Sequence, residues 1–534
     1  MAERDSYRIR STNDMLKTLP PLQREGFLFQ TDVKPIIQSI GVELTLLIIL
    51  FVGLFLRIYH LGYESIWIDE GYSIIFAKLN PSQIIEVTSK DDFHTPFYYI
   101  ILHYWMNLFG DSEFSIRFPS AIFGFLAILM IYKVGSLIFD KKVGLLSSLI
   151  LALSIFHIHY SQDARMYSLM AFLTLVSMYF FIRLMKERSF GTSIGYILSS
   201  TLLIYTQYFG LFIVVAQNIY LATLFLFSRE KLKINLRKWV LLQVTIILLF
   251  APWIVILVKQ MLRVKSGFWI PEPTFGTLVK SFRVYSGHYL FILFLILSFF
   301  SAVRFKRIRG KINWKGVFKS AETYGINKNL SDISNIYLLL VWLLTPIILP
   351  FIISKVLTPV YWDRYTIGAS VAFYILIAKG ISNINHKYVK SAVIGIVVIG
   401  SLVNVWGYHT GTNKEQWRGI ANYVDANAQP GDLVLFNADF CQYSFDYHSE
   451  RTDLVKKPLL YSEVDKENIK NLRPIVRDYN RVWAVLAYTS DDNKERIKET
   501  LNEFHKQSYD GKFVSYAYAT GDYAQLELYL FKKK

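Results

Sequence analysis

Two adjacent carboxylates, Asp69 and Glu70, stand in the stretch "WIDEGYS" (residues 67–73), shortly after the apolar run "LTLLIILFVGLFL". Neighbouring side chains on a helix or a strand point in different directions, so we expect one carboxylate to face a site and the other to brace the chain. A carboxylate in a pocket beside a bilayer has a raised pKa and can act as a general base. The structural alternative is that Asp69 caps the helix that begins "EGYSIIFAKL".

A third acidic residue, Asp163, stands with Arg165 in "HYSQDARMYSL", at the start of another apolar segment. Its place at a helix start would let it point into a cavity that it shares with Asp69. Upstream, His94 precedes a Thr-Pro turn, and Arg117 stands at the start of the apolar segment "SIRFPSAIFG". An arginine there can clamp a phosphate or a carboxylate. The structural alternative is a cap or an ion pair at the interface, with the arginine reaching to lipid headgroups.

Further candidate phosphate ligands occur late in the chain. Arg364 and Tyr365 precede an apolar segment in "YWDRYTIGAS", where a guanidinium and a phenol could grip a phosphate. Arg263 and Lys265 occur in "KQMLRVKSGFWIPEP" and would face the same side. For each residue alone, contact with headgroups in an aromatic belt is an equally good interpretation.

The chain around these residues has the composition of a membrane protein. Of its 534 residues, 53% are hydrophobic and only 19% are charged, which excludes an ordinary soluble domain. Apolar segments long enough to cross a bilayer recur along it. We predict an α-helical polytopic membrane protein with about eleven spans near 43–59, 116–138, 143–160, 165–183, 191–207, 209–227, 239–257, 288–303, 335–353, 365–381 and 389–407.

The charges between the spans indicate the orientation. Alternate connections are rich in Lys and Arg, which marks them as cytoplasmic. The chain then begins inside and ends outside, with Asp69, Glu70, Asp163 and Asp363 on the outer face. We attribute the net charge of +17 to these loops, whose Lys and Arg side chains contact anionic lipids. We therefore expect no nucleic-acid partner. The basic connections are 140–142, 183–189, 229–238, 304–319 and 383–387.

Three regions follow from this pattern. Residues 1–42 form a basic cytoplasmic tail, and residues 43–407 form the membrane domain. Its first outer loop, 60–115, is large and includes "PFYYIILHYWMNLFG", an interfacial helix. We read 258–287 as another outer loop. Residues 408–534 alternate strands with helices and predict a small soluble α/β domain outside the membrane.

Metal and disulfide chemistry find little support in the sequence. Cys441 is the single cysteine, so neither an intrachain disulfide nor a cysteine metal cluster can form. Zinc and calcium signatures such as HExxH, CxxC and the EF-hand loop are absent from the sequence.

The order of the motifs carries more information than any one of them. "WIDEGYS", then "HTPFYYIILHYWMNLFGDSEFSIRFPSAIFG", "YSQDARMYSL" and "DRYTIGAS" together resemble the polyprenyl-phosphate-dependent glycosyltransferases of the GT-C superfamily. The resemblance is strongest to the branch that includes protein O-mannosyltransferases and the lipid A aminoarabinose transferase. It covers roughly residues 43–410.

This resemblance implies a reaction and a site. Such enzymes move a sugar from a polyprenyl-phosphate carrier to an acceptor on the outer face, usually with inversion; the acceptor can be a protein, a lipid or a glycan. Asp69 would be the general base, with Glu70 as its support and Asp163 as the second acidic residue. His94 stands where the aminoarabinose branch has a phosphate-binding lysine, which departs from that branch. The substrate-binding candidates are His94, Arg117, Arg165, Arg263, Lys265, Arg364 and Tyr365.

Two other functions compete with this one. A transporter or flippase of a lipid-linked glycan would need charges within its spans and access from both faces. A metal-dependent transferase or ligase that uses a diphosphate carrier would hold a divalent cation at Asp69 and Asp163. We expect no required cofactor, and we expect a multi-pass protein of the plasma membrane with its site on the extracytoplasmic side.

Overall fold

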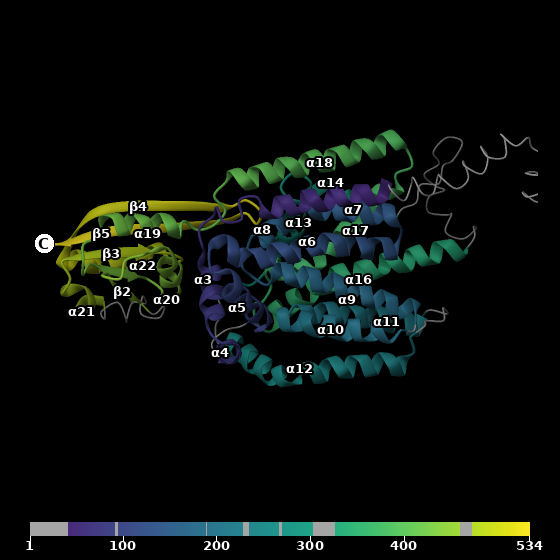
Figure 1. The fold of residues 1–534 in the computed structure, drawn as a ribbon, viewed down its shortest axis with the longest axis horizontal. Coiled ribbons are helices and arrows are strands. Elements are labelled where there is room, and N and C mark those ends of the chain that lie inside the picture. Colours follow the sequence, from purple (N-terminus) through teal and green to yellow (C-terminus); the bar gives the residue numbers. More distant parts are fainter. Residues whose placement is uncertain are drawn as a thin grey trace, which may run out of the picture.

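The computed structural model describes residues 41–90, 94–187, 189–227, 234–265, 270–302, 326–459 and 472–534. The predicted tail lies outside the described residues up to residue 40, as do residues 229–233 of the basic connection 229–238 and the whole of 304–319. The molecule has two parts that lie end to end: a bundle of helices and, beyond one end of it, a β-sheet with helices packed on it (Figure 1).

The bundle consists of apolar helices that lie side by side (Figure 1). A 3-10 turn, η1 (Asp363–Thr366), precedes one of the most buried of them, α17. The helices are Gly41–Ile58, α6 (Glu113–Ile138), α7 (Lys141–Leu153), α8 (Ile155–Ser161), α9 (Tyr167–Lys186), α10 (Phe190–Thr206), α11 (Gly210–Phe227), α12 (Leu236–Lys265), α13 (Phe275–Ser286), α14 (Phe291–Phe300), α16 (Ile326–Val356), α17 (Ile367–Asn383) and α18 (Lys387–Thr410).

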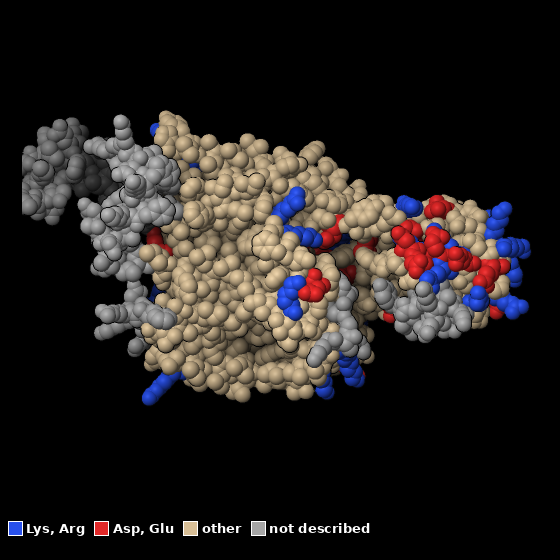
Figure 2. All heavy atoms as spheres, turned by 180° about the vertical axis from the view of Figure 1, so that it is seen from behind, with Lys and Arg blue, Asp and Glu red and all other residues tan. Residues whose placement is uncertain are grey.

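The outward faces of this bundle are apolar. Phe51 is 72% exposed, Leu248 67% and Trp406 74%, and such side chains require lipid rather than water around them. On the face shown in Figure 2, acidic and basic side chains gather on the sheet domain and at its junction with the bundle, whereas the middle of the bundle carries few. The protein is therefore a multi-pass membrane protein.

The described helices give fewer spans than the sequence pattern predicts. Within the described residues, seven helices are long and apolar enough to cross a membrane, or nine if each of two bent pairs makes one span. Helices α10 (17 residues) and α11 (18 residues) coincide with two further predicted segments but are not among these seven helices. The count of eleven and the orientation remain predictions.

One of the two bent pairs, α13 with α14, corrects an expectation. Residues 258–287 were expected to form a loop, but α12 continues to Lys265 and α13 occupies Phe275–Ser286. A capping box at Thr274 starts α13, and Gly287, with a φ of 71°, ends it. Helix α14 then turns by 90° from α13, so the span expected at 288–303 corresponds to the second half of a bent helix pair.

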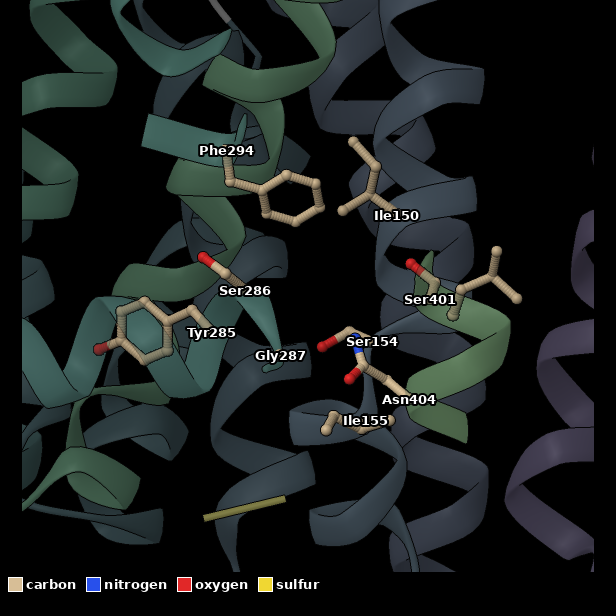
Figure 3. A pocket seen from close by; sticks show the side chains of 10 residues that line it. Ile150, Ser154, Ile155, Tyr285, Ser286, Gly287, Phe294, Ser401 and Asn404 are labelled. Atoms are coloured by element: carbon tan, nitrogen blue, oxygen red, sulfur yellow. The ribbon is translucent and has the colours of Figure 1, made fainter. Parts of the chain in front are cut away.

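The other break, between α7 and α8, is stabilised by a buried arginine. Arg57 donates to the carbonyl oxygens of Leu151 (3.2 Å) and Ala152 (3.3 Å) at the end of α7, where the Leu151 oxygen also accepts from the Ser154 amide (3.4 Å). Ser154 caps α8 by accepting from the His157 amide. A small cavity lies beside this break, between Ser154, Gly287 and Asn404 of α18 (Figure 3). Both breaks thus meet at one end of the bundle.

Three short helices separate the bundle from the sheet domain (Figure 1). They are α3 (Ile68–Lys78), α4 (Pro81–Lys90) and α5 (Phe97–Phe109), and they make up most of the predicted outer loop. The predicted helix in "PFYYIILHYWMNLFG" is present as α5. Ile68 of α3 packs into the same apolar core as Trp417 and Phe436 of the sheet domain, so the outer loop and that domain share a core.

The C-terminal domain has a five-stranded mixed sheet with the order β2-β1-β3-β5-β4. Strand β1 pairs in parallel with β2 and β3, and β5 pairs antiparallel with β3 and β4. Every residue of β1 is buried, as expected for a parallel strand covered on both faces. The elements are α19 (Trp417–Asn427), β1 (Leu433–Phe436), α20 (Asp439–His448), β2 (Val455–Pro458), α21 (Leu472–Arg477), β3 (Arg481–Leu486), α22 (Asp491–Phe504), β4 (His505–Ala517) and β5 (Asp522–Lys533).

Candidate active site

The adjacent carboxylates lie in the first turn of α3. Trp67 occupies the N-cap position, and no side chain caps this helix. The alternative in which Asp69 is the cap is therefore wrong. Acidic side chains in a first turn are favoured by the positive end of the helix dipole. Because the two residues are consecutive on a helix, Asp69 and Glu70 point to different surroundings.

Glu70 is fully buried against Arg117 of α6. The Arg117 guanidinium donates to both carboxylate oxygens of Glu70 at 2.7 Å, and to the carbonyl oxygens of Leu61 (3.0 Å), Glu64 (2.9 Å) and Ser65 (2.8 Å). These bonds engage all its N–H groups. Arg117 thus fastens α3 to α6, and no donor remains for a phosphate. The structure assigns it to Glu70 rather than to a ligand.

A lysine from the C-terminal domain completes this buried cluster. The ammonium of Lys414 lies 2.7 Å from Glu70 Oε1 and 3.4 Å from Asp163 Oδ1. The sequence pattern does not indicate this contact, because "KEQWRG" reads as the start of a soluble helix. Its place directly after the last predicted span, next to the predicted outer face, is the signal that could have drawn notice to Lys414.

Asp163 occupies the loop between α8 and α9 and is also fully buried. Its Oδ1 accepts from the Trp67 indole at 2.8 Å. Burial raises the pKa of Asp163 to about 6, although Lys414 acts against this shift. Burial acts the same way on Glu70, but Arg117 and Lys414 hold the pKa of Glu70 well below its usual value. Glu70 is therefore the firmly ionised member of the pair.

Asp69 differs from these two carboxylates because it reaches the surface. Its side chain is 21% exposed, whereas those of Glu70 and Asp163 are 0% exposed. Arg364 donates to Asp69 Oδ2 at 3.0 Å, and Arg165 Nε lies 4.0 Å from the same oxygen. Asp69 is thus an accessible carboxylate that lies between two guanidinium groups.

Arg165 connects Asp69 to the predicted residue His94. Its Nη1 donates to the Asp69 carbonyl oxygen (3.2 Å) and to the Tyr99 hydroxyl (3.1 Å), and its Nη2 lies 3.1 Å from His94 Nε2. The structure therefore brings Asp69, His94, Arg165 and Arg364 together from α3, the turn before α5, the α8–α9 loop and η1.

Aromatic rings surround the guanidinium of Arg364. Its central carbon lies 6.0 Å from the Trp67 ring centre, 5.8 Å from that of Tyr167 and 5.5 Å from that of Tyr365. These contacts stabilise the cation and place the predicted Tyr365 in the site. The Tyr167 side chain is 0% exposed, and its hydroxyl has no hydrogen-bond partner among the described residues. Tyr167 is a site residue that the sequence analysis did not single out.

The C-terminal domain makes a second contact close to Arg364. Lys280 of α13 is 2.9 Å from Asp522, at the tip of the β4–β5 hairpin, and 3.5 Å from Asp363. Asp363 Oδ1 in turn accepts from the Arg364 amide at 2.7 Å. The hairpin thus helps to hold the turn that presents Arg364.

Two predicted ligands are not placed in this cluster by the structure. Arg263 is exposed near the end of α12, which reaches the outer loop where Gln260 donates to the Thr88 carbonyl oxygen at 2.7 Å. The side chain of Lys265 lies outside the described part of the chain. Both remain predictions.

A divalent cation between Asp69 and Asp163 fits these surroundings poorly. Arg364 already neutralises Asp69, and Lys414 lies against Asp163. Within the described ranges, no group of three or more His, Cys, Asp or Glu side chains could hold a metal ion. The chemistry of this site is therefore best described through its arginines and lysine.

The chain is similar to one protein family and to several solved structures. Residues 93–256 match the family described as dolichyl-phosphate-mannose-protein mannosyltransferase, and no curated protein matches the sequence. Apo ArnT from Cupriavidus metallidurans aligns with a TM-score of 0.51 and 12% identity over 92% of this chain and 97% of ArnT. The fold is that of the GT-C glycosyltransferases. The resemblance drawn from the ordered motifs is thereby confirmed.

Two further GT-C structures contain polyprenyl phosphates. ArnT from the same organism bound to undecaprenyl phosphate aligns with a TM-score of 0.50 and 12% identity, over 92% of this chain and 98% of ArnT. The archaeal oligosaccharyltransferase AglB from Archaeoglobus fulgidus, in complex with an inhibitory peptide and a dolichol-phosphate, aligns with a TM-score of 0.54 and 11% identity, over 91% of this chain and 74% of AglB. At these identities the likeness establishes the fold of our chain.

Proposed function

We propose that this protein is a membrane glycosyltransferase that moves a sugar from a polyprenyl-phosphate carrier to a hydroxyl of an acceptor on the extracytoplasmic face. One observation carries the proposal: Asp69, the accessible carboxylate, lies beside the guanidinium groups of Arg165 and Arg364. The cluster carries two positive charges and one negative charge, so it can bind a phosphodiester anion. The lipid-linked phosphate would lie at the depth of this cluster.

The chemistry follows from these positions. Asp69 takes the proton of the acceptor hydroxyl, whose oxygen attacks the anomeric carbon from the side opposite the phosphate. The bond from this carbon to the phosphate oxygen breaks, and polyprenyl phosphate leaves with one more negative charge. Arg165 and Arg364 stabilise that charge without any reorganisation, since the surrounding residues already hold them. This course inverts the configuration of the sugar.

The remaining predicted residues have distinct roles in this proposal. Glu70 and Asp163 support the site, because both are buried and bound to cations. His94 and Tyr365 bind the donor beside the arginines, and Tyr167 joins them. The acceptor is a protein, a lipid or a glycan of the cell envelope, and the enzyme lies in the plasma membrane.

Replacement of Asp69 tests the proposal. In proteoliposomes with polyprenyl-phosphate sugars supplied in the outer leaflet, we expect Asp69→Asn to lower the rate of donor consumption by about 10²–10⁴-fold, as for the loss of a general base. Asp111→Asn, which alters an exposed carboxylate of the same outer loop, serves as the control. Wild-type activity in the Asp69 variant would refute the assignment of the base. Consumption that requires translocation of the lipid would instead favour a flippase.

A further inference from the structure

The segment that leads into the C-terminal domain is buried in the membrane domain's site. Helix α18 ends at Thr410 and α19 begins at Trp417. Between them, Lys414 and Glu415 are only 5% and 4% exposed. Arg418 holds this segment in place, since it donates to Glu113 at 2.8 Å and to the Tyr63 carbonyl oxygen at 2.9 Å. A domain boundary is normally exposed, so its burial here needs an explanation.

The contacts of Lys414 provide that explanation. Its ammonium donates to Glu70 Oε1 (2.7 Å), to the Gln162 carbonyl oxygen (2.9 Å) and to Asp163 Oδ1 (3.4 Å). These acceptors use all three of its N–H groups. They come from two separate segments, α3 and the α8–α9 loop. Lys414 therefore ties these two segments together.

The same loop carries Arg165. Glu70 Oε1, which Lys414 contacts, also accepts from the Ala164 amide at 3.0 Å, and the Arg165 amide donates to the Asp163 carbonyl oxygen at 2.7 Å. The direction of the Arg165 side chain therefore depends on a backbone that Lys414 and Glu70 hold. A displaced loop would move Arg165 away from Asp69 and His94.

The charges show why a cation is required at this position. Glu70 and Asp163 are two buried carboxylates, and Arg117 and Lys414 are the two buried cations against them. With Lys414 removed, one buried negative charge is left uncompensated, which is costly in a region of low polarity. Either the loop would then move, or one of the two carboxylates would take up a proton.

We propose that Lys414 is a positioning residue for Arg165, and that the C-terminal domain is in this way a part of the site for the carrier phosphate. This inference rests on the proposed function. Through the Lys280–Asp522 contact, the same domain also helps to position the turn that carries Arg364. The domain thus contributes to the arrangement of both guanidinium groups.

Binding of undecaprenyl phosphate to the full-length protein in nanodiscs tests this role without any knowledge of the sugar. We expect Lys414→Met to weaken the affinity at pH 7 by about 10–100-fold. We expect the double variant Lys414→Met/Asp163→Asn to recover most of it, because the remaining Glu70–Arg117 pair is neutral. Lys494→Met, which breaks a similar partly buried ion pair with Glu527 far from the site, is the matched control and should bind as wild type does.

Each outcome decides the inference. Wild-type affinity in Lys414→Met overturns it, and so does a double variant that folds but binds no better than the single variant. If the single variant does not fold, recovery of both folding and binding in the double variant supports it, whereas a double variant that also fails to fold makes Lys414 a purely structural residue. Failure of the wild-type protein itself to bind undecaprenyl phosphate would refute the proposed function instead.

Discussion

The reassignment of Arg117 from the carrier phosphate to Glu70 leads to a quantitative prediction. Arg117→Met keeps a long side chain but removes the two hydrogen bonds to the Glu70 carboxylate and three to backbone carbonyl oxygens between Leu61 and Ser65. Removing one partner of a buried ion pair costs about 3–5 kcal/mol. Since Lys414 continues to neutralise Glu70, we expect the lower end, about 3 kcal/mol.

This loss should appear locally, as opening of the chain segment that Arg117 holds. About 3 kcal/mol corresponds to a roughly 100-fold increase in the opening equilibrium. Hydrogen exchange of peptides covering residues 61–75, measured on the full-length protein in nanodiscs, reads out this equilibrium directly. Arg183→Met is the control, because the Arg183–Glu187 pair is exposed and such pairs contribute little.

A matched double variant distinguishes structural support from ligand binding. Arg117→Met/Glu70→Gln should exchange more slowly than Arg117→Met alone, because the uncompensated part of the buried charge is gone. Unchanged exchange in Arg117→Met, combined with weaker binding of undecaprenyl phosphate, would contradict our reasoning. Arg117 would then be a ligand of the carrier phosphate.

Two further predictions concern neighbouring groups. Tyr167→Phe should weaken undecaprenyl phosphate binding by about tenfold, which corresponds to the loss of one hydrogen bond to a charged group, and should leave thermal stability unchanged. Tyr196→Phe removes a hydroxyl that is bonded to Gln217, so it should lower thermal stability and leave the binding unchanged. Asp163 should titrate near pH 6, visible as a carboxyl infrared band that Asp163→Asn removes, and a midpoint near 4 would contradict this. Because its pKa is raised on folding from 3.8, the native state binds the extra proton, and stability should fall as the pH rises from about 4 to 6.

The sequence by itself determined those features that depend on local chemistry. A long apolar segment has few structural solutions other than a helix in lipid, so most helices of the bundle follow from composition alone. Helix α13 does not, because residues 258–287 were expected to form a loop. The helix at "EGYSIIFAKL", the helix α5 and the alternation of strands and helices in the C-terminal domain follow from local patterns as well. The edge strand β2 did not, because "VKKP" is charged and partly exposed and so resembles a turn. The order of four short motifs was enough to indicate the fold.

The partners of each carboxylate were decided only by the tertiary structure. Asp69 and Glu70 are neighbours in sequence and alike in chemistry, yet the first meets Arg364 at 21% exposure and the second meets Arg117 and Lys414 at 0%. These partners lie far away in the chain, in different helices and in another domain. The pKa and the accessibility of an ionisable group depend on which charges and how much apolar volume surround it. Such surroundings exist only after the α3 helix, the bundle and the C-terminal domain have packed together, which is why Arg117 looked like a phosphate ligand and Lys414 was not noticed.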